Sequence, residues 1–250
     1  MAVFEDILAR YAALPERALS EPWRWPGHES EPLEVRDALL RSLELELAVL
    51  VRSGSETGEV ARTVAQAQAA FGDLRGLLCG QPDGLLDAEP GDGEWTLRRV
   101  LQHILWVDRR YLFQTAYAAR RSDEDPLRAE PDVPLEDAPT VTAWLRRLAA
   151  EREDCRSLLD IPERQLARPT VWAGHAVDVR FRLHRFTGHL VQHTVHCEKV
   201  LRRLGHLDSE ARQLARRISI ARGGHELLSE RAILVDLDAQ HLTLANSISV

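Results

Sequence analysis

The fold is decided by the stretch WTLRRVLQHILWVD, residues 95–108, which predicts a long helix with a histidine on its inner side. Thr96 is a typical N-cap residue, because its side-chain oxygen can accept a hydrogen bond from a free amide of the first turn. Val100 and Val107 lie three residues before and four residues after His103, so the imidazole shares a helix face with two apolar side chains. We therefore expect His103 to point into the protein.

A second helical segment, residues 179–204, carries the sequence His189-Leu-Val-Gln-His193. The spacing i, i+4 places both imidazoles on one face of a helix. His196 adds a third imidazole to the same side. Imidazoles on an apolar, inward face are costly to bury without partners, and a metal ion would satisfy several of them together. Two helices that supply His103, His189 and His193 would hold a divalent metal with open coordination positions.

The rest of the chain also has a predominantly helical pattern of apolar residues. The predicted helices are residues 3–13, 33–51, 59–79, 96–120, 140–159, 179–204 and 208–221. Residues 121–139 form a long acidic and proline-rich connection, which would let the helices before and after it run parallel. Gly223 and Gly224 are expected to break the helix before them. Residues 232–250 are expected to be either a strand or irregular structure, and their alternation is too weak to decide between the two.

Composition limits the class of protein. The chain has 250 residues, of which 44% are hydrophobic and 28% are charged, and this is typical of a globular protein with ample material for a core. No stretch approaches the roughly 20 apolar residues of a membrane span, and the N-terminus lacks a signal-peptide pattern. A net charge of −7 argues against a nucleic-acid partner. The three cysteines form no disulfide framework. We expect a cytoplasmic protein with neither a membrane nor a nucleic acid as partner.

The two histidine segments together resemble the DinB/YfiT-like superfamily of four-helix metalloenzymes. Residues 95–108 are similar to the family's tryptophan, helix and histidine pattern, and the segment around His189 and His193 is similar to its His-x-x-x-His helix. The resemblance covers about residues 60–205. It implies an all-α four-helix bundle with a long crossover between its second and third helices. The predicted division is an N-terminal helical extension (1–54), the bundle (55–206) and a C-terminal extension (207–250) packed on it.

The resemblance also implies the site and its chemistry. The family's three metal-binding histidines correspond to His103, His189 and His193, and zinc is the expected metal, with nickel or iron as alternatives. Relatives include transferases that use small thiols such as mycothiol or bacillithiol. The implied function is the transfer of a low-molecular-weight thiol to an electrophilic small molecule. His196 stands where many members have glutamine or asparagine. We assign it as a candidate catalytic base, and the alternatives are a fourth metal ligand or a residue that supports the ligands from outside.

Two other functions stay open from the sequence. One is a metal-dependent hydrolase or isomerase that uses metal-bound water, for which His196 would act as the base. The other is a non-catalytic metal-binding or stress-response protein, or a helical interaction module. The terminal extensions either form a homodimer interface or cover the open end of the bundle.

Overall fold

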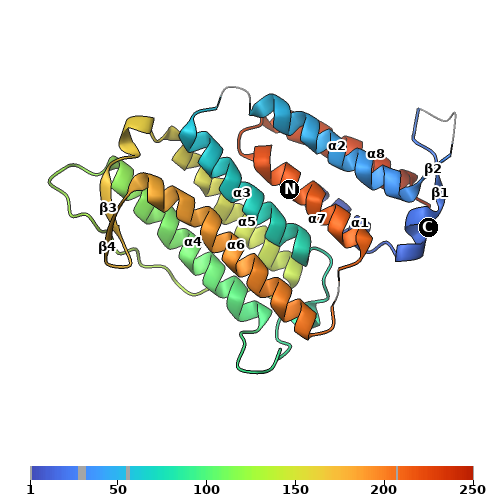
Figure 1. Cartoon of the computed structure of the whole chain (residues 1–250), viewed down its shortest axis with the longest axis horizontal. Helices are drawn as coiled ribbons and strands as arrows, with labels where there is room; N and C mark the ends of the chain where they lie inside the picture. The colour runs from blue at the N-terminus through green and yellow to red at the C-terminus, as the bar shows by residue number, and fades with distance from the viewer. Residues whose placement is uncertain (1, 28–31, 55–56, 207, 250) are drawn as a thin grey trace.

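The computed structural model describes residues 2–27, 32–54, 57–206 and 208–249, and most of them are helical (Figure 1). The helices are α1 (Ala2–Ala12), α2 (Val35–Ser53), α3 (Glu59–Leu78), α4 (Leu97–Arg120), α5 (Val141–Asp154), α6 (Val179–Arg203), α7 (Glu210–Glu226) and α8 (Arg231–Ser247). Two antiparallel hairpins add β1 (Pro22–Trp23) with β2 (Leu33–Glu34) and β3 (Pro169–Trp172) with β4 (His175–Asp178). This confirms the predicted all-α class.

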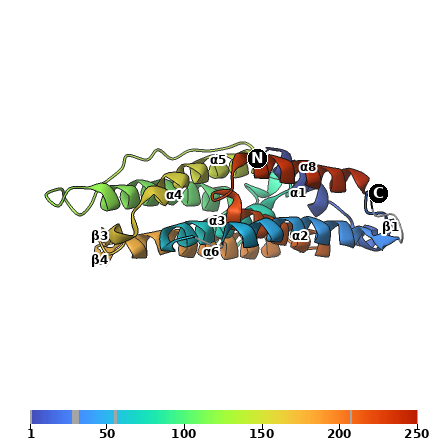
Figure 2. The same cartoon turned by 90° about the horizontal axis from the view of Figure 1, so that it is seen from above.

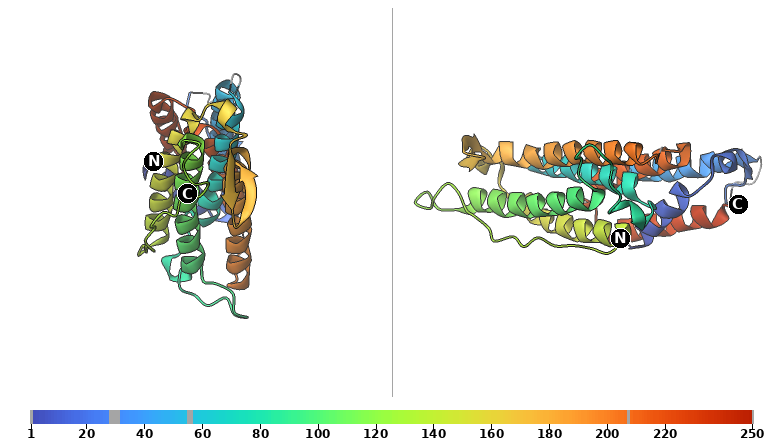
Figure 3. Two further views of the ribbon diagram at one scale, coloured as in Figure 1. Left: turned by 90° about the vertical axis from the view of Figure 1, so that its left-hand side faces the viewer. Right: turned by 90° about the horizontal axis from the view of Figure 1, so that it is seen from below.

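The helices form two layers in an elongated molecule. Figures 2 and 3 show α6, α3 and α2 along one layer and α4, α5, α1 and α8 along the other. Helix α3 packs against α6 on one side and against α7 on the other, and α7 in turn packs against α2. Helices α3, α4, α5 and α6 lie on the left of Figure 1, and α1, α2, α7 and α8 lie on its right. Helix α3 therefore contacts both groups of helices, through α6 on one side and α7 on the other.

The long connection between α4 and α5 behaves as the sequence predicts. It leaves α4 at one end of the bundle and returns along its outside, so that α5 runs parallel to α4 (Figures 1 and 2). Arg98 fixes the end of this connection, because its guanidinium pairs with Asp137 at 2.5 Å and with Asp87 at 2.6 Å. The connection thus passes over α4 close to the residues that form the candidate site.

The helices that carry the histidines begin and end at recognisable signals. The Thr96 hydroxyl accepts a hydrogen bond from the backbone amide of Arg99 at 3.4 Å, which confirms the predicted N-cap of α4. The Asp178 carboxylate accepts one from the Phe181 amide at 2.8 Å and caps α6 in the same way. Gly205 follows α6 with a φ of +78°, a conformation that glycine adopts without steric cost.

The prediction for the C-terminal segment was wrong in two places. Helix α7 continues through Gly223 and Gly224, and residues 231–247 form helix α8. The glycines do not end the helix because Gly223 lies where α7 meets α3. A Cβ at that position would lie 2.5 Å from the carbonyl oxygen of Gln68, so only glycine fits. The second hairpin, β3 with β4, was not predicted and occupies part of the expected loop before α6.

Two glycines of α3 lie at the same crossing of α3 and α7, on the α3 side. A Cβ at Gly72 would lie 2.3 Å from the carbonyl oxygen of Ser219, and one at Gly76 would lie 2.6 Å from the Cα of Arg216. Both are separations that real Cβ atoms do not adopt. The backbones of α3 and α7 are therefore in direct contact along this crossing.

A buried carboxylate joins three helices that are far apart in the sequence. Glu46 on α2 is fully buried and accepts hydrogen bonds from His225 Nε2 at 2.7 Å and from His241 Nε2 at 2.5 Å. Arg222 Nε donates to the same carboxylate at 2.9 Å. Burial opposes ionisation of Glu46, but these three donors outweigh it and hold its pKa well below the usual range. The cluster ties α2 to α7 and α8.

Candidate metal centre

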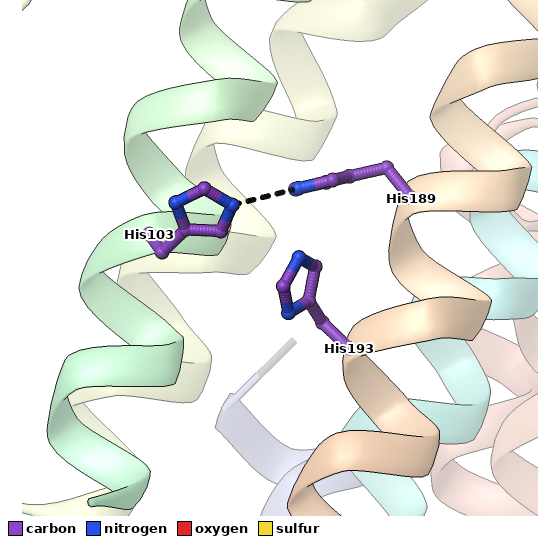
Figure 4. Close-up of side chains that lie close together, drawn as sticks. All are labelled: His103, His189 and His193. Atoms are coloured by element: carbon purple, nitrogen blue, oxygen red, sulfur yellow. Dashed lines mark hydrogen bonds between the residues drawn. The ribbon is translucent and has the colours of Figure 1, made fainter. Parts of the chain in front are cut away.

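The structure brings the three predicted histidines together between α4 and α6. Figure 4 shows His103 on one helix pointing toward His189 and His193 on the other. One ring nitrogen of each residue lies within 4.8 Å of the others, and the Nε2 atoms of His103 and His189 are 3.4 Å apart. His189 and His193 are buried, whereas His103 is partly exposed. The cluster is thus closed on the α6 side and open beside His103.

Apolar side chains on both helices turn the imidazoles inward. Val100 and Val107 flank His103 on α4, and both are buried. On α6, Phe186 and Val200 are buried at helical spacing from the histidine pair. The inward direction that the sequence predicted for His103 follows from this packing.

The environment favours the neutral form of two of the imidazoles, those of His193 and His103. Burial, followed by the proximity of His189 and His103, lowers the pKa of His193 from 6.5 to about 3. Burial, followed by the proximity of His189, also lowers the pKa of His103. Neutral imidazole is the form that binds a metal ion, so these residues need not lose a proton near neutral pH before they coordinate.

The spacing of one pair of nitrogens matches that of two ligands of one divalent ion. Two ligands that each lie about 2.0–2.1 Å from a tetrahedral metal are about 3.3 Å apart. The 3.4 Å between the Nε2 atoms of His103 and His189 is close to that value. In addition, Nδ1 of His189 and Nδ1 of His193 are buried without a hydrogen-bond partner among the described residues. Three imidazoles, two of which have a buried nitrogen without a partner, are a donor set suited to a zinc-like metal.

A buried acid that we had not singled out lies behind His189. Asp108 Oδ1 is 3.9 Å from His189 Nδ1, and neither atom has a hydrogen-bond partner among the described residues. The other oxygen, Oδ2, accepts a hydrogen bond from Arg152 Nη1 at 3.3 Å. A carboxylate in this place can orient a histidine whose other nitrogen binds a metal. The sequence held one signal for it, since Asp108 is a charged residue on a helix face that is otherwise apolar.

His196 lies beside the cluster but outside it. Its ring centroid is 6.2 Å from that of His193, and its Nε2 lies 3.3 Å from Glu94 Oε2. Glu94 also pairs with Lys199, and that hydrogen bond lowers the pKa of the Glu94 carboxyl. His196 therefore lies next to a negative charge and close to the three histidines. Nothing in the sequence indicated that Glu94 would lie there.

A pocket of about 380 Å³ opens in front of His103. Its lining residues are Trp95, Arg99, Gln102, His103, Trp106 and Leu135. The first five belong to α4 or to the residues just before it, and Leu135 comes from the long connection. The pocket gives a small molecule access to the exposed side of the histidine cluster.

Comparison with known proteins agrees with this arrangement. A sequence model of the DinB superfamily matches residues 66–197, which is more than half of the chain and includes all three histidines. No curated protein and no solved structure matches the chain. Within the described ranges, no helix is long and apolar enough to cross a lipid bilayer.

Proposed function

The chain belongs to the DinB superfamily, and from that premise we propose that it is a divalent-metal-dependent enzyme with His103, His189 and His193 as ligands. The observation that carries the proposal is the convergence of three imidazoles, with one ring nitrogen of each within 4.8 Å of the others. Zinc is the metal that we expect, and nickel or iron(II) would suit the same donors. Three protein ligands leave at least one coordination position for a substrate, and the pocket beside His103 lies where such a substrate would enter.

We propose that the reaction is the transfer of a low-molecular-weight thiol to an electrophilic substrate. A divalent metal at the site would lower the pKa of a thiol and favour its nucleophilic thiolate form. In the transfer, the thiol loses its proton, its sulfur forms a bond to the electrophilic carbon, and the leaving group departs with the bonding electron pair. The pair of His196 and Glu94 is close enough to the cluster to receive the proton.

The properties of the three cysteines support the proposal that the reacting thiol is a small molecule and not a side chain of the protein. Cys79, Cys155 and Cys197 are all buried. Burial raises the pKa of Cys79 and Cys197 to about 12 and that of Cys155 to about 11, so none of them forms a thiolate near neutral pH. A sulfur nucleophile at this site would thus have to be supplied by a small molecule.

One observation favours a second candidate, a metal-dependent hydrolase or isomerase. His196 Nε2 lies 3.3 Å from a carboxylate oxygen of Glu94, so a small rotation would let this acid orient the imidazole as a general base. Such a base would serve the activation of a water molecule better than the transfer of a thiolate. Assays with small thiols and with ester or amide substrates would separate the two reactions.

The first test is the metal content of tag-free protein, measured per chain by inductively coupled plasma mass spectrometry. We expect about one equivalent of zinc, nickel or iron. His193→Ala should lower both the metal content and the melting temperature, because bound metal stabilises only the folded state. His196→Gln serves as the matched control and should keep its metal.

Three outcomes would change the proposal. Protein that stays empty after incubation with each divalent ion would leave only a non-catalytic function. Full metal content in His193→Ala, with an unchanged melting temperature, would remove that residue from the ligand set. Loss of metal from His196→Gln would make His196 a fourth ligand.

A further inference from the structure

The pocket in front of His103 has two aromatic walls. The ring centroids of Trp95 and Trp106 lie 5.4 Å and 6.5 Å from that of His103, and both side chains line the pocket. Aromatic rings attract one another at centroid separations of about 4.5–7 Å. A planar ring that entered this space of about 380 Å³ would therefore find stacking partners beside the histidine cluster.

Arg99 adds a positive charge that has no acidic partner. Its guanidinium carbon lies 4.5 Å from the centroid of Trp95, and among the described residues no carboxylate oxygen comes within 4.0 Å of its nitrogens. Arg110 on the same helix provides a comparison. It stacks on Trp106 at 4.7 Å but is paired with Glu130 at 3.0 Å. Arg99 is therefore the arginine of this region that remains available to an anion.

The other lining residues are compatible with an anionic, largely apolar ligand. Gln102 can donate a hydrogen bond, and Leu135 offers an apolar surface of which 69% is exposed. No acidic side chain of the described residues lines the pocket, so none would repel a carboxylate. Arginine is also the side chain best suited to bind a carboxylate with two parallel hydrogen bonds.

We propose that this pocket binds a small aromatic carboxylate, with its ring against Trp95 and Trp106 and its carboxylate on Arg99. The inference rests on the proposed function, because it names the substrate class of the three-histidine site. Arg99 and His103 are four residues apart on α4, which is about 6 Å along the helix axis. A single aromatic ring with substituents spans that length, so its far end reaches the cluster while its carboxylate stays on Arg99.

The test is calorimetric titration of chelator-treated, metal-free protein with 1-naphthoate and, separately, with its neutral amide. Removal of metal matters, because a carboxylate could otherwise bind to the ion. We expect naphthoate to bind about tenfold more tightly than the amide, as is typical of one charge-assisted contact at a partly exposed site. Arg99→Gln should abolish that difference, and Trp106→Leu should weaken the binding of both compounds.

Arg110→Gln is the matched control, since it removes an arginine that also stacks on a tryptophan but does not line the pocket. It should bind naphthoate as the unmodified protein does. Equal affinity for acid and amide, an unchanged preference in Arg99→Gln, or no binding at all would overturn the inference. The metal measurement is independent of this titration. Naphthoate binding by a protein that never takes up metal would refute the proposed function alone, and metal uptake without naphthoate binding would refute this inference alone.

Discussion

At the scale of single residues, the proximity of Asp108 to His189 is the feature that a proposed metal site would use and that a chance group of histidines would lack. Their facing atoms, Oδ1 and Nδ1, are 3.9 Å apart, and both are buried without a hydrogen-bond partner among the described residues. Unsatisfied buried polar atoms destabilise a protein, so two of them that face each other indicate a contact formed in another state. Metal binding through Nε2 would fix the proton on Nδ1 and direct it toward the carboxylate.

Asp108→Asn should therefore weaken metal binding while all three ligands remain. We expect the affinity for zinc to fall by about 10- to 100-fold, the range typical of carboxylates that orient a ligand histidine. Competition with a chromophoric chelator measures the affinity. The absorption spectrum of the cobalt form would report the changed orientation of His189, which a purely structural role of Asp108 would not affect.

The control for this variant is Glu226→Gln, the same change of acid to amide in the same buried polar network. Glu226 accepts hydrogen bonds from Arg75 and Gln68, and Gln68 in turn binds Arg152, the partner of Asp108. This variant should lose stability but keep its metal affinity. An equal loss of affinity in both variants would mean that the network acts only through the stability of the bundle.

The sequence predicted the candidate site only in part, and the reason is physical. His103, His189 and His193 could be proposed because helical periodicity shows which side chains share a face. The roles of Glu94 and Asp108 could not be proposed from the sequence. They depend on how α4, and the residues just before α4, pack against α6. Periodicity within one helix contains no information on such contacts. The assignment of His196 as a base stays a prediction.

At the scale of helices, the crossing of α3 and α7 depends on the absence of side chains. Gly72 and Gly76 on α3 and Gly223 on α7 each face backbone atoms of the partner helix at separations that exclude a Cβ. This is also why the sequence misled us about Gly223. Glycine usually weakens a helix, and only the neighbouring helix reveals that it is required for close approach.

Gly72→Ala should destabilise the protein by about 2 kcal/mol. Alanine favours a helix over glycine by about 1 kcal/mol, but its Cβ would lie 2.3 Å from the Ser219 carbonyl oxygen, and overpacking of this kind dominates. Urea denaturation measures the change. Gly188→Ala on α6 is the control, because its Cβ would meet only the flexible end of Arg185 at 3.4 Å, and it should be neutral or stabilising. Equal stability of the two variants would contradict the proposed close contact.

At the scale of the whole molecule, the Glu46 cluster makes stability depend on pH. The folded pKa of Glu46 lies below its ordinary value of 4.5, so the unfolded state takes up a proton first as the pH falls. The contribution of Glu46 is therefore complete above pH 4.5 and declines as the pH falls from there toward the folded pKa.

Glu46→Gln should lower the free energy of unfolding by about 3 kcal/mol at pH 7, because it removes one of the two carboxylates that pair with the buried Arg222 and leaves only Asp238. The difference in the free energy of unfolding between this variant and the unmodified protein should become smaller below pH 4.5. Denaturation curves at pH 7, 5 and 3.5 test both statements. Glu44→Gln alters an exposed pair on the same helix and should shift stability by less than about 1 kcal/mol at every pH. A difference that stays constant with pH would show that Glu46 is not ionised in the fold.

The packing of α7 and α8 against α1 and α2 also bears on how the chain is made. Helices α1 and α2 precede α7 and α8 in the chain, so they leave the ribosome before these partners do. At about 5–20 residues per second, the interval between the end of α2 and the end of α7 is on the order of ten seconds. Throughout that time the faces of α1 and α2 that α7 and α8 cover in the folded protein lack these partners. The nascent chain therefore exposes these faces until α7 and α8 have been made.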